Sequence, residues 1–125
     1  MTPVIFILLS LAGGVGAALR LLVDGLVRTR IKLTYPLGTT VINVSGSFLL
    51  GVITALTLSR VLPEGWHLVL GAGLMGGYTT FSTASFETVR LIQEHRYGAA
   101  LANSLGMLIG AIAAAVFGLW IGSTL

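Results

Sequence analysis

The sequence has no cysteine and very little charge. Without cysteine among its 125 residues, the chain cannot form disulfides, thiol nucleophiles or thiolate metal sites. Only 9% of the residues are charged and 55% are hydrophobic, whereas a soluble domain averages about 25% charged residues. This composition predicts a membrane protein, and the length predicts a single domain over residues 1–125.

Side chains suited to catalysis or to nucleic-acid binding are also scarce. His67 and His95 lie in or beside expected loops, without the carboxylate or cysteine neighbours of a metal site. The serines and threonines of the apolar segments have no histidine base near them, and no glycine-rich run continues into a nucleotide loop. The net charge of +3 comes without an aromatic and basic patch. We therefore expect neither an enzyme nor a nucleic-acid-binding protein.

Four apolar segments, separated by charged connectors, make up most of the chain. They cover residues 4–23, 33–59, 68–86 and 97–125. A membrane-spanning helix needs about 20 mostly apolar residues, so each segment is long enough. The connectors, over residues 28–32, 60–65 and 93–96, are too short to hold a soluble domain. The sequence therefore predicts an all-α membrane protein with four transmembrane helices.

Positive charge is distributed unevenly between the two ends of the predicted bundle. Four spans place both termini and the second connector at one end, which carries only Arg60. The opposite end carries five cationic side chains in or near the connectors: Arg28, Arg30, Lys32, Arg90 and Arg96. The positive-inside rule then predicts a multi-pass protein of the inner (plasma) membrane with its first and third connectors in the cytoplasm.

An unusual stretch interrupts the third segment. The adjacent glycines Gly76 and Gly77 are followed by a run of hydroxyl-bearing residues that extends to Ser85. Each interior glycine costs a helix about 1 kcal/mol relative to alanine. In hydrocarbon a broken helix is tolerated only where it is buried in protein or lines a wet cavity. The stretch predicts that the third helix is broken near its middle and forms a site for a small polar species.

Asn43 is a second candidate, because an unpaired amide at membrane depth is costly. Either an interhelical hydrogen bond or an ion would satisfy it. Thr39 lies four residues earlier on the same helix face, and both side chains can donate to an anion. An asparagine also carries an acceptor, so this pair alone does not fix the sign of the ligand.

Three further features each have two interpretations. Arg20 either forms a helix-end salt bridge with Asp24 or places positive charge at a vestibule that attracts anions. Phe81 either packs like other membrane phenylalanines or turns its positive ring edge to an anion, beside the hydroxyls of Ser82 and Thr83. Small residues recur every four positions in the fourth segment, which indicates intramolecular helix packing or a subunit interface. They are Gly98, Ala102, Gly106, Gly110, Ala114, Gly118 and Gly122.

Glu87 and Arg90, three residues apart, are expected to form a helix-end pair.

Three stretches resemble the CrcB, or Fluc, family of small fluoride channels. They are residues 16–20 (GAALR), 36–46 (PLGTTVINVSG) and 76–83 (GGYTTFST), and the likeness extends over essentially the whole chain. The resemblance implies an antiparallel dimer with two fluoride pores, surrounded by lipid, through which cytoplasmic fluoride leaves passively and becomes less toxic. It also implies a structural, untransported Na+ held by backbone carbonyls at positions matching Gly76 and Thr79.

The family's anion path gives roles to several positions of this chain. The matching residues are Asn43, Phe81 and Arg20, with Asn103 on the fourth helix. The hydroxyls of Thr39, Ser82 and Thr83 complete the path that we predict.

The chain departs from the family's pattern at positions that would face the pore. Ala84 stands where a second phenylalanine is expected, and Met107 and Ala111 replace polar residues of the fourth helix. The one-sided positive charge also suits a fixed orientation, whereas homodimeric members insert both ways. In some bacteria two unlike subunits of opposite orientation form a heterodimer with one decayed pore. These departures predict half of such a heterodimer, with a homodimer as the alternative.

Two other functions stay open on the sequence alone. A small four-helix multidrug exporter needs a titratable carboxylate at membrane depth. The first two segments contain no glutamate, and Asp24 lies near a connector beside Arg20. A non-conducting partner subunit fits the altered pore positions, although the retained Asn43 and Phe81 oppose it.

Overall fold

The computed structural model describes all 125 residues, and the chain is helical throughout apart from short connections. The first two passes are α1 (Pro3–Arg30) and α2 (Leu37–Leu58). The third consists of α3 (Glu64–His67), the π-helix η1 (Leu68–Met75), α4 (Gly76–Tyr78) and, after a break, α5 (Ser82–Gln93). The fourth consists of α6 (Tyr97–Leu101), the π-helix η2 (Ala102–Gly106) and α7 (Met107–Ser123).

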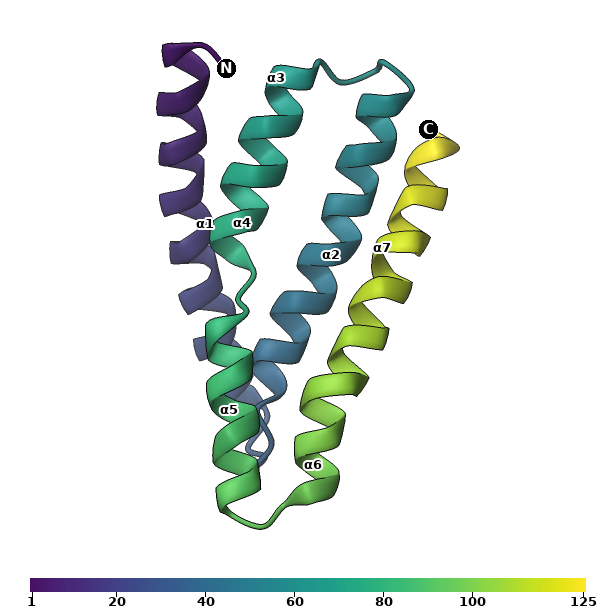
Figure 1. Ribbon diagram of the computed structural model, residues 1–125. Helices are drawn as coiled ribbons and strands as arrows, with labels where there is room; N and C mark the ends of the chain where they lie inside the picture. The colour runs from purple at the N-terminus through teal and green to yellow at the C-terminus, as the bar shows by residue number, and fades with distance from the viewer.

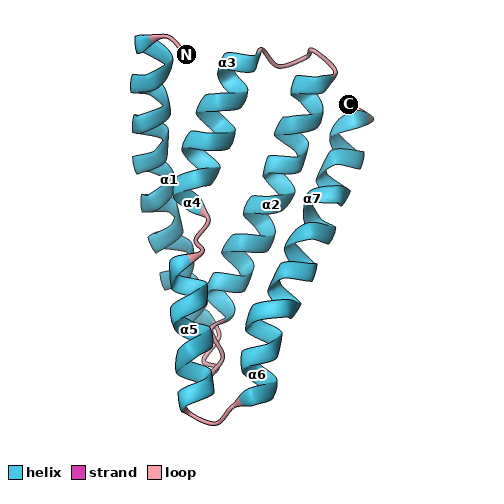
Figure 2. Cartoon of the chain, viewed as in Figure 1, coloured by secondary structure: helices cyan, strands magenta, loops and turns pink.

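The four passes run side by side along one bundle. Both termini lie at the same end as the connection between α2 and α3, as four crossings require (Figure 1). Helices Pro3–Arg30, Leu37–Leu58 and Tyr97–Ser123 are long and apolar enough to cross a membrane. The third pass crosses the bundle in two pieces, and Figure 2 shows the loop between α4 and α5. The predicted all-α fold with a broken third helix is confirmed, and three of the four predicted spans are continuous helices long enough to cross a membrane.

The first helix is longer than the sequence predicted. It continues to Arg30, so three of the five residues of the expected first connector are helical. Within it Asp24 pairs with Arg28, with Nε and Oδ2 3.1 Å apart, so the expected pair with Arg20 is wrong. An acid placed four residues before a base is the favoured order on a helix, and cations suit its C-terminal end.

The expected pair of Glu87 and Arg90 is also wrong. The Nε of Arg90 lies 3.5 Å from the Oε2 of Glu94, one helical turn further along α5. Glu87 forms no salt bridge, and its Oε1 is buried without a hydrogen-bond partner. Glu94 caps the C-terminal end of α5, so this pair sits at the helix end.

Glycines allow the second and fourth passes to pack closely. A Cβ at Gly118 would meet the carbonyl of Phe48, and a Cβ at Gly51 would meet the carbonyl of Ala115. Gly122 likewise lies against the backbone of Val52. Intramolecular packing is therefore confirmed for the C-terminal half of the small-residue series. Gly98 meets no neighbour, so a subunit interface there stays a prediction.

The piece of the third pass before the break packs against α1 in the same way. A Cβ at Gly16 would meet the carbonyl of Leu74, and one at Gly77 would meet the backbone of Gly13. Beside this contact, Ile42, Met75 and Tyr78 form a small buried cluster. The hydroxyl of Tyr78 lies 3.0 Å from that of Ser45. These contacts fix the position at which the third helix ends.

The two glycines before the break should differ sharply in their tolerance of alanine. Gly77→Ala places a methyl group against the backbone of α1, which cannot move aside like a flexible side chain. We expect it to lower the free energy of unfolding by about 1–3 kcal/mol. Gly76 meets nothing within 4 Å, so Gly76→Ala serves as the matched control. Thermal unfolding in detergent checks this, and equal losses for both variants would contradict it.

Candidate functional site

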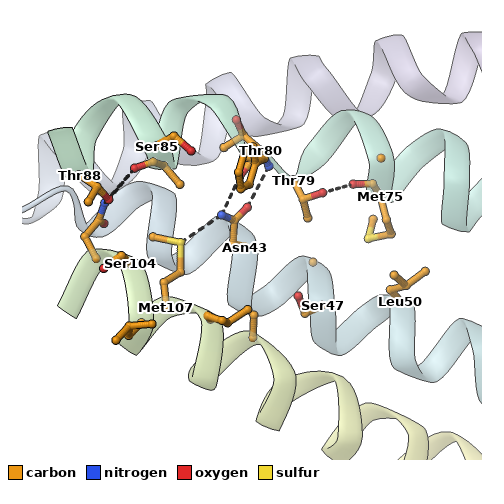
Figure 3. A pocket seen from close by; sticks show the side chains of 18 of the residues that line it. Asn43, Ser47, Leu50, Met75, Thr79, Thr80, Ser85, Thr88, Ser104 and Met107 are labelled. Atoms are coloured by element: carbon orange, nitrogen blue, oxygen red, sulfur yellow. Dashed lines mark hydrogen bonds between the residues drawn. The ribbon is translucent and has the colours of Figure 1, made fainter. Parts of the chain in front are cut away.

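A groove of about 730 Å³ follows the break in the third pass. Its walls come from α2, from the residues on both sides of the break, and from η2 and the start of α7 (Figure 3). Of the predicted site residues, Asn43, Phe81, Asn103, Gly76 and Thr79 line this groove. The structure thus brings the predicted break, amide, ring and fourth-helix amide together in one place.

Asn43 bridges directly to the break. Its Nδ2 donates to the carbonyl of Thr80 at 2.8 Å, and its Oδ1 accepts from the N–H of Thr80 at 2.9 Å. Thr80 lies between α4 and α5, where its backbone has lost its helical partners. One side chain therefore satisfies both polar groups of a residue 37 positions away. This is the interhelical hydrogen bond that the sequence left as one of two interpretations.

A second donor contact of Asn43 reaches the fourth pass. Its Nδ2 also lies 3.2 Å from the Sδ of Met107, the first residue of α7. Met107 is buried, and in Figure 3 its thioether reaches across the groove to the amide. The Asn43 amide therefore makes two hydrogen bonds to the break and a third contact, on the side away from the break, to sulfur.

Asn103 joins the fourth pass to the second half of the third. Its Nδ2 donates to the carbonyl of Ala84 at 3.2 Å and to the Oγ1 of Thr88 at 2.9 Å. The carbonyl of Ala84 can only accept, so it fixes which end of the amide is nitrogen. Asn103 is only 1% exposed, yet its buried Oδ1 has no hydrogen-bond partner. It offers an acceptor to a water molecule or to a partner's donor.

The helix ends at Thr79, beside the groove. The N–H and the hydroxyl of Thr79 both donate to the carbonyl of Met75, at 2.9 and 2.8 Å. The last carbonyls of a helix have no intrahelical donors, so those between Gly76 and Thr79 form a cluster of acceptors. No group of three or more His, Cys, Asp or Glu side chains could hold a metal ion anywhere in the chain. The backbone carbonyls at the break are oxygen ligands of the kind that a hard cation takes.

Four predicted site residues lie outside the groove. Thr39 is buried beside the carboxyl of Glu87, and Ser82 is exposed at the start of α5. The N–H of Thr83 donates to the Oγ1 of Thr80 at 3.1 Å. Arg20 is half-buried on α1, and its Nε is buried without a hydrogen-bond partner.

Ring position distinguishes the candidate Phe81 from Phe86, the next phenylalanine along the chain. Phe81 lines the groove with its side chain 86% exposed, whereas Phe86 is 68% exposed and does not line it. A ring that exposed has no intramolecular packing role. Its surface is available to a second subunit or to a ligand in the groove.

Sequence reasoning missed several polar groove residues, among them Ser47, Ser85 and Thr88. Ser47 follows Asn43 by four residues, so the helical spacing used for Thr39 would have found it. Ser85 and Thr88 carry no such signal, because the direction of α5 is set only after the break. Ala84, Met107 and Ala111, the positions that depart from the family's pattern, all line the same groove.

Comparison with known proteins identifies the family. The sequence profile described as "CrcB-like protein, Camphor Resistance (CrcB)" matches residues 7–119. The chain belongs to the CrcB family. A CrcB relative in Leifsonia xyli subsp. xyli, named fluoride-specific ion channel FluC 1, is 53% identical over 122 residues, covering 98% of this chain and 89% of the relative. The Bifidobacterium longum protein named fluoride-specific ion channel FluC 3 is 45% identical over 116 residues, covering 90% and 96%.

Proposed function

We propose that this chain is a subunit of a fluoride-specific ion channel that lets cytoplasmic fluoride leave passively. Membership of the CrcB family and the names of its relatives support this. The observation that carries the proposal is the groove at the helix break, where Asn43 and Phe81 meet. Fluoride enters cells as the weak acid HF, which dissociates at neutral pH, so a passive path for the anion lowers its toxicity.

Neutral donors and a ring edge would carry the anion along this path. Ser47 and Ser85 line the groove with their hydroxyls, and each follows a candidate anion-path residue, Asn43 or Phe81, by four positions. Asn103 contributes through its unpaired oxygen, by way of water. Arg20 has no acidic partner, so its charge is available to raise the local anion concentration at a vestibule.

The absence of carboxylates from the groove opposes the multidrug-exporter alternative. No Asp or Glu lines it. Asp24 and Glu87 instead share a smaller cavity of about 230 Å³ with Arg28 and Arg90. A proton-coupled exporter needs its carboxylate where the substrate binds. The same absence argues against catalysis in the groove, because no histidine, cysteine, aspartate or glutamate lines it.

A second subunit would complete the groove. Only 18 of the 125 residues are buried, and Phe81, which lines the groove, is 86% exposed. We propose an antiparallel dimer, either with a second copy or with a second CrcB-like subunit, in the inner membrane with the first and third connectors in the cytoplasm. The grouping of Ala84, Met107 and Ala111 in one groove favours the heterodimer, because the partner would then supply the missing ring and polar groups.

Sodium would bind at the break, held by the carbonyls of Gly76 and Thr79. Bound there, the ion would neutralise part of the carbonyl field and so favour anions nearby.

Removal of sodium should therefore weaken the assembly. An ion present at about a hundred times its Kd stabilises the species that binds it by about 2.7 kcal/mol. Exchanging sodium for N-methylglucamine should lower both the dimer fraction in size-exclusion chromatography and the fluoride flux. Returning sodium should restore both. A dimer and a flux that are indifferent to sodium would exclude this ion from the break.

Fluoride release from living cells tests the proposed function. Bacteria without a fluoride exporter of their own, producing this chain with its candidate partner, should grow at fluoride concentrations that stop cells carrying the empty vector. Collapse of the proton gradient should leave fluoride release intact if transport is passive. Release that stops with the proton gradient would instead support an exporter.

A further inference from the structure

The orientation of the Asn43 amide is fixed by the backbone that it contacts. The N–H of Thr80 can meet only oxygen, and the carbonyl of Thr80 can meet only nitrogen. The Nδ2 therefore spends one of its two hydrogens on the carbonyl of Thr80. Its second hydrogen is the only donor of this amide left for an anion.

That second hydrogen points to the sulfur of Met107, whose Sδ lies 3.2 Å from the Nδ2 of Asn43. A thioether is a weak acceptor, whereas a hydrogen bond to an anion is roughly twice as strong as a neutral one. A buried donor with no partner at all would cost about 1–3 kcal/mol. The sulfur therefore offsets part of the cost of burying this donor, and an anion, as a stronger acceptor, replaces it readily.

The side chain of Met107 is also flexible enough to move away from Asn43. Its side chain has three rotatable bonds and no branch, so it can change rotamer without a backbone shift. It lines the groove, whose volume of about 730 Å³ leaves space for the displaced thioether. Leucine or isoleucine at this position would fill the same space without offering an acceptor.

We propose that Met107 holds the groove-facing N–H of Asn43 when no anion is present and yields it to fluoride. Met107 is thus a specificity-determining residue, whose acceptor strength sets the fluoride concentration at which the path fills. This inference rests on the proposed function, since it concerns the same groove. A weak acceptor is displaced only by a stronger one, so small, strongly accepting anions gain most.

Variants at position 107 separate acceptor strength from volume. Met107→Leu keeps a similar volume and removes the acceptor, Met107→Gln keeps a similar length and adds a strong carbonyl acceptor, and Met107→Ala removes bulk. The measurement is the half-saturating fluoride concentration of the reconstituted channel, with its second subunit present where one is required. We expect Leu to lower this concentration a few-fold and Gln to raise it about tenfold, which corresponds to about 1.4 kcal/mol.

One pattern among the position-107 variants would contradict the proposal. If Leu, Met and Gln share one value and only Ala differs, Met107 acts by bulk and the proposal is wrong. Absence of any fluoride flux from the unaltered chain would instead defeat the proposed function. The two failures are therefore distinguishable.

A spectroscopic readout on the unaltered protein avoids dependence on the folding of variants. In a sample labelled with ¹⁵N-asparagine, the two Nδ2 protons of Asn43 give separate signals. Addition of sodium fluoride to a chloride-free sample should shift the proton bonded to sulfur downfield and leave the one bonded to Thr80 nearly unchanged. A titration that moves neither proton, or both equally, would overturn the assignment.

Discussion

Replacing Asn43 with aspartate should abolish fluoride movement. The carboxylate cannot donate to the carbonyl of Thr80 or to an anion, and it adds negative charge to the groove. Two like charges about 4 Å apart repel by about 4 kcal/mol at an effective dielectric constant of 20. At 1.4 kcal/mol per tenfold, this amounts to roughly a thousandfold loss of flux. The initial rate of fluoride loss from loaded liposomes measures it.

A neutral variant separates the two reasons for this loss. Asn43→Ala removes the bridge to Thr80 and the donor without adding charge, so it should retain more flux than the aspartate variant. Equal flux in the two variants would assign the whole effect to loss of the amide and none of it to the added charge. Unchanged flux in Asn43→Asp would remove Asn43 from the anion path altogether.

Replacing Phe81 with leucine should lower flux by up to about tenfold. Leucine keeps apolar bulk but has no positive ring edge, an interaction worth about 0.5–1.5 kcal/mol in aromatic pairs. Phe86 offers a matched control because it is also exposed yet does not line the groove. Phe86→Leu should leave flux close to that of the unaltered chain. If the two variants behave alike, the ring-edge interaction plays no part in conduction.

The fold was predictable because its main signals are local. Apolar length and charged connectors define the passes, and Gly76 and Gly77 with the hydroxyl run define the break. The first helix was predicted too short because its last turns carry charge. Arginine is nevertheless a good helix former, and Asp24 and Arg28 support the helix across one turn.

The groove was predictable only in part because its contacts are non-local. Asn43 and Thr80 are 37 residues apart, and nothing in either segment shows that one satisfies the other. A helix that restarts after a break has no fixed rotation relative to the part before it. Ser82 and Thr83 therefore lie outside the groove while Ser85 lines it. Spacing within a single helix cannot supply that rotation.

Thr39 shows the limit of the helical-face argument on an unbroken helix. It shares a face with Asn43, yet one turn away it is buried beside Glu87 on α5, outside the groove. A shared face becomes a shared site only where the neighbouring elements leave both residues uncovered. Ser47, one turn in the other direction, meets that condition.

Fluoride efflux from liposomes, followed with a fluoride electrode, tests the central claim most directly. Liposomes holding this chain with a second CrcB-like subunit of opposite positive-charge bias should release fluoride rapidly and retain chloride. Liposomes holding this chain alone should release fluoride slowly, and fast release from them would favour a homodimer. Vesicles that contain both subunits and still retain their fluoride would contradict the assignment of a fluoride channel.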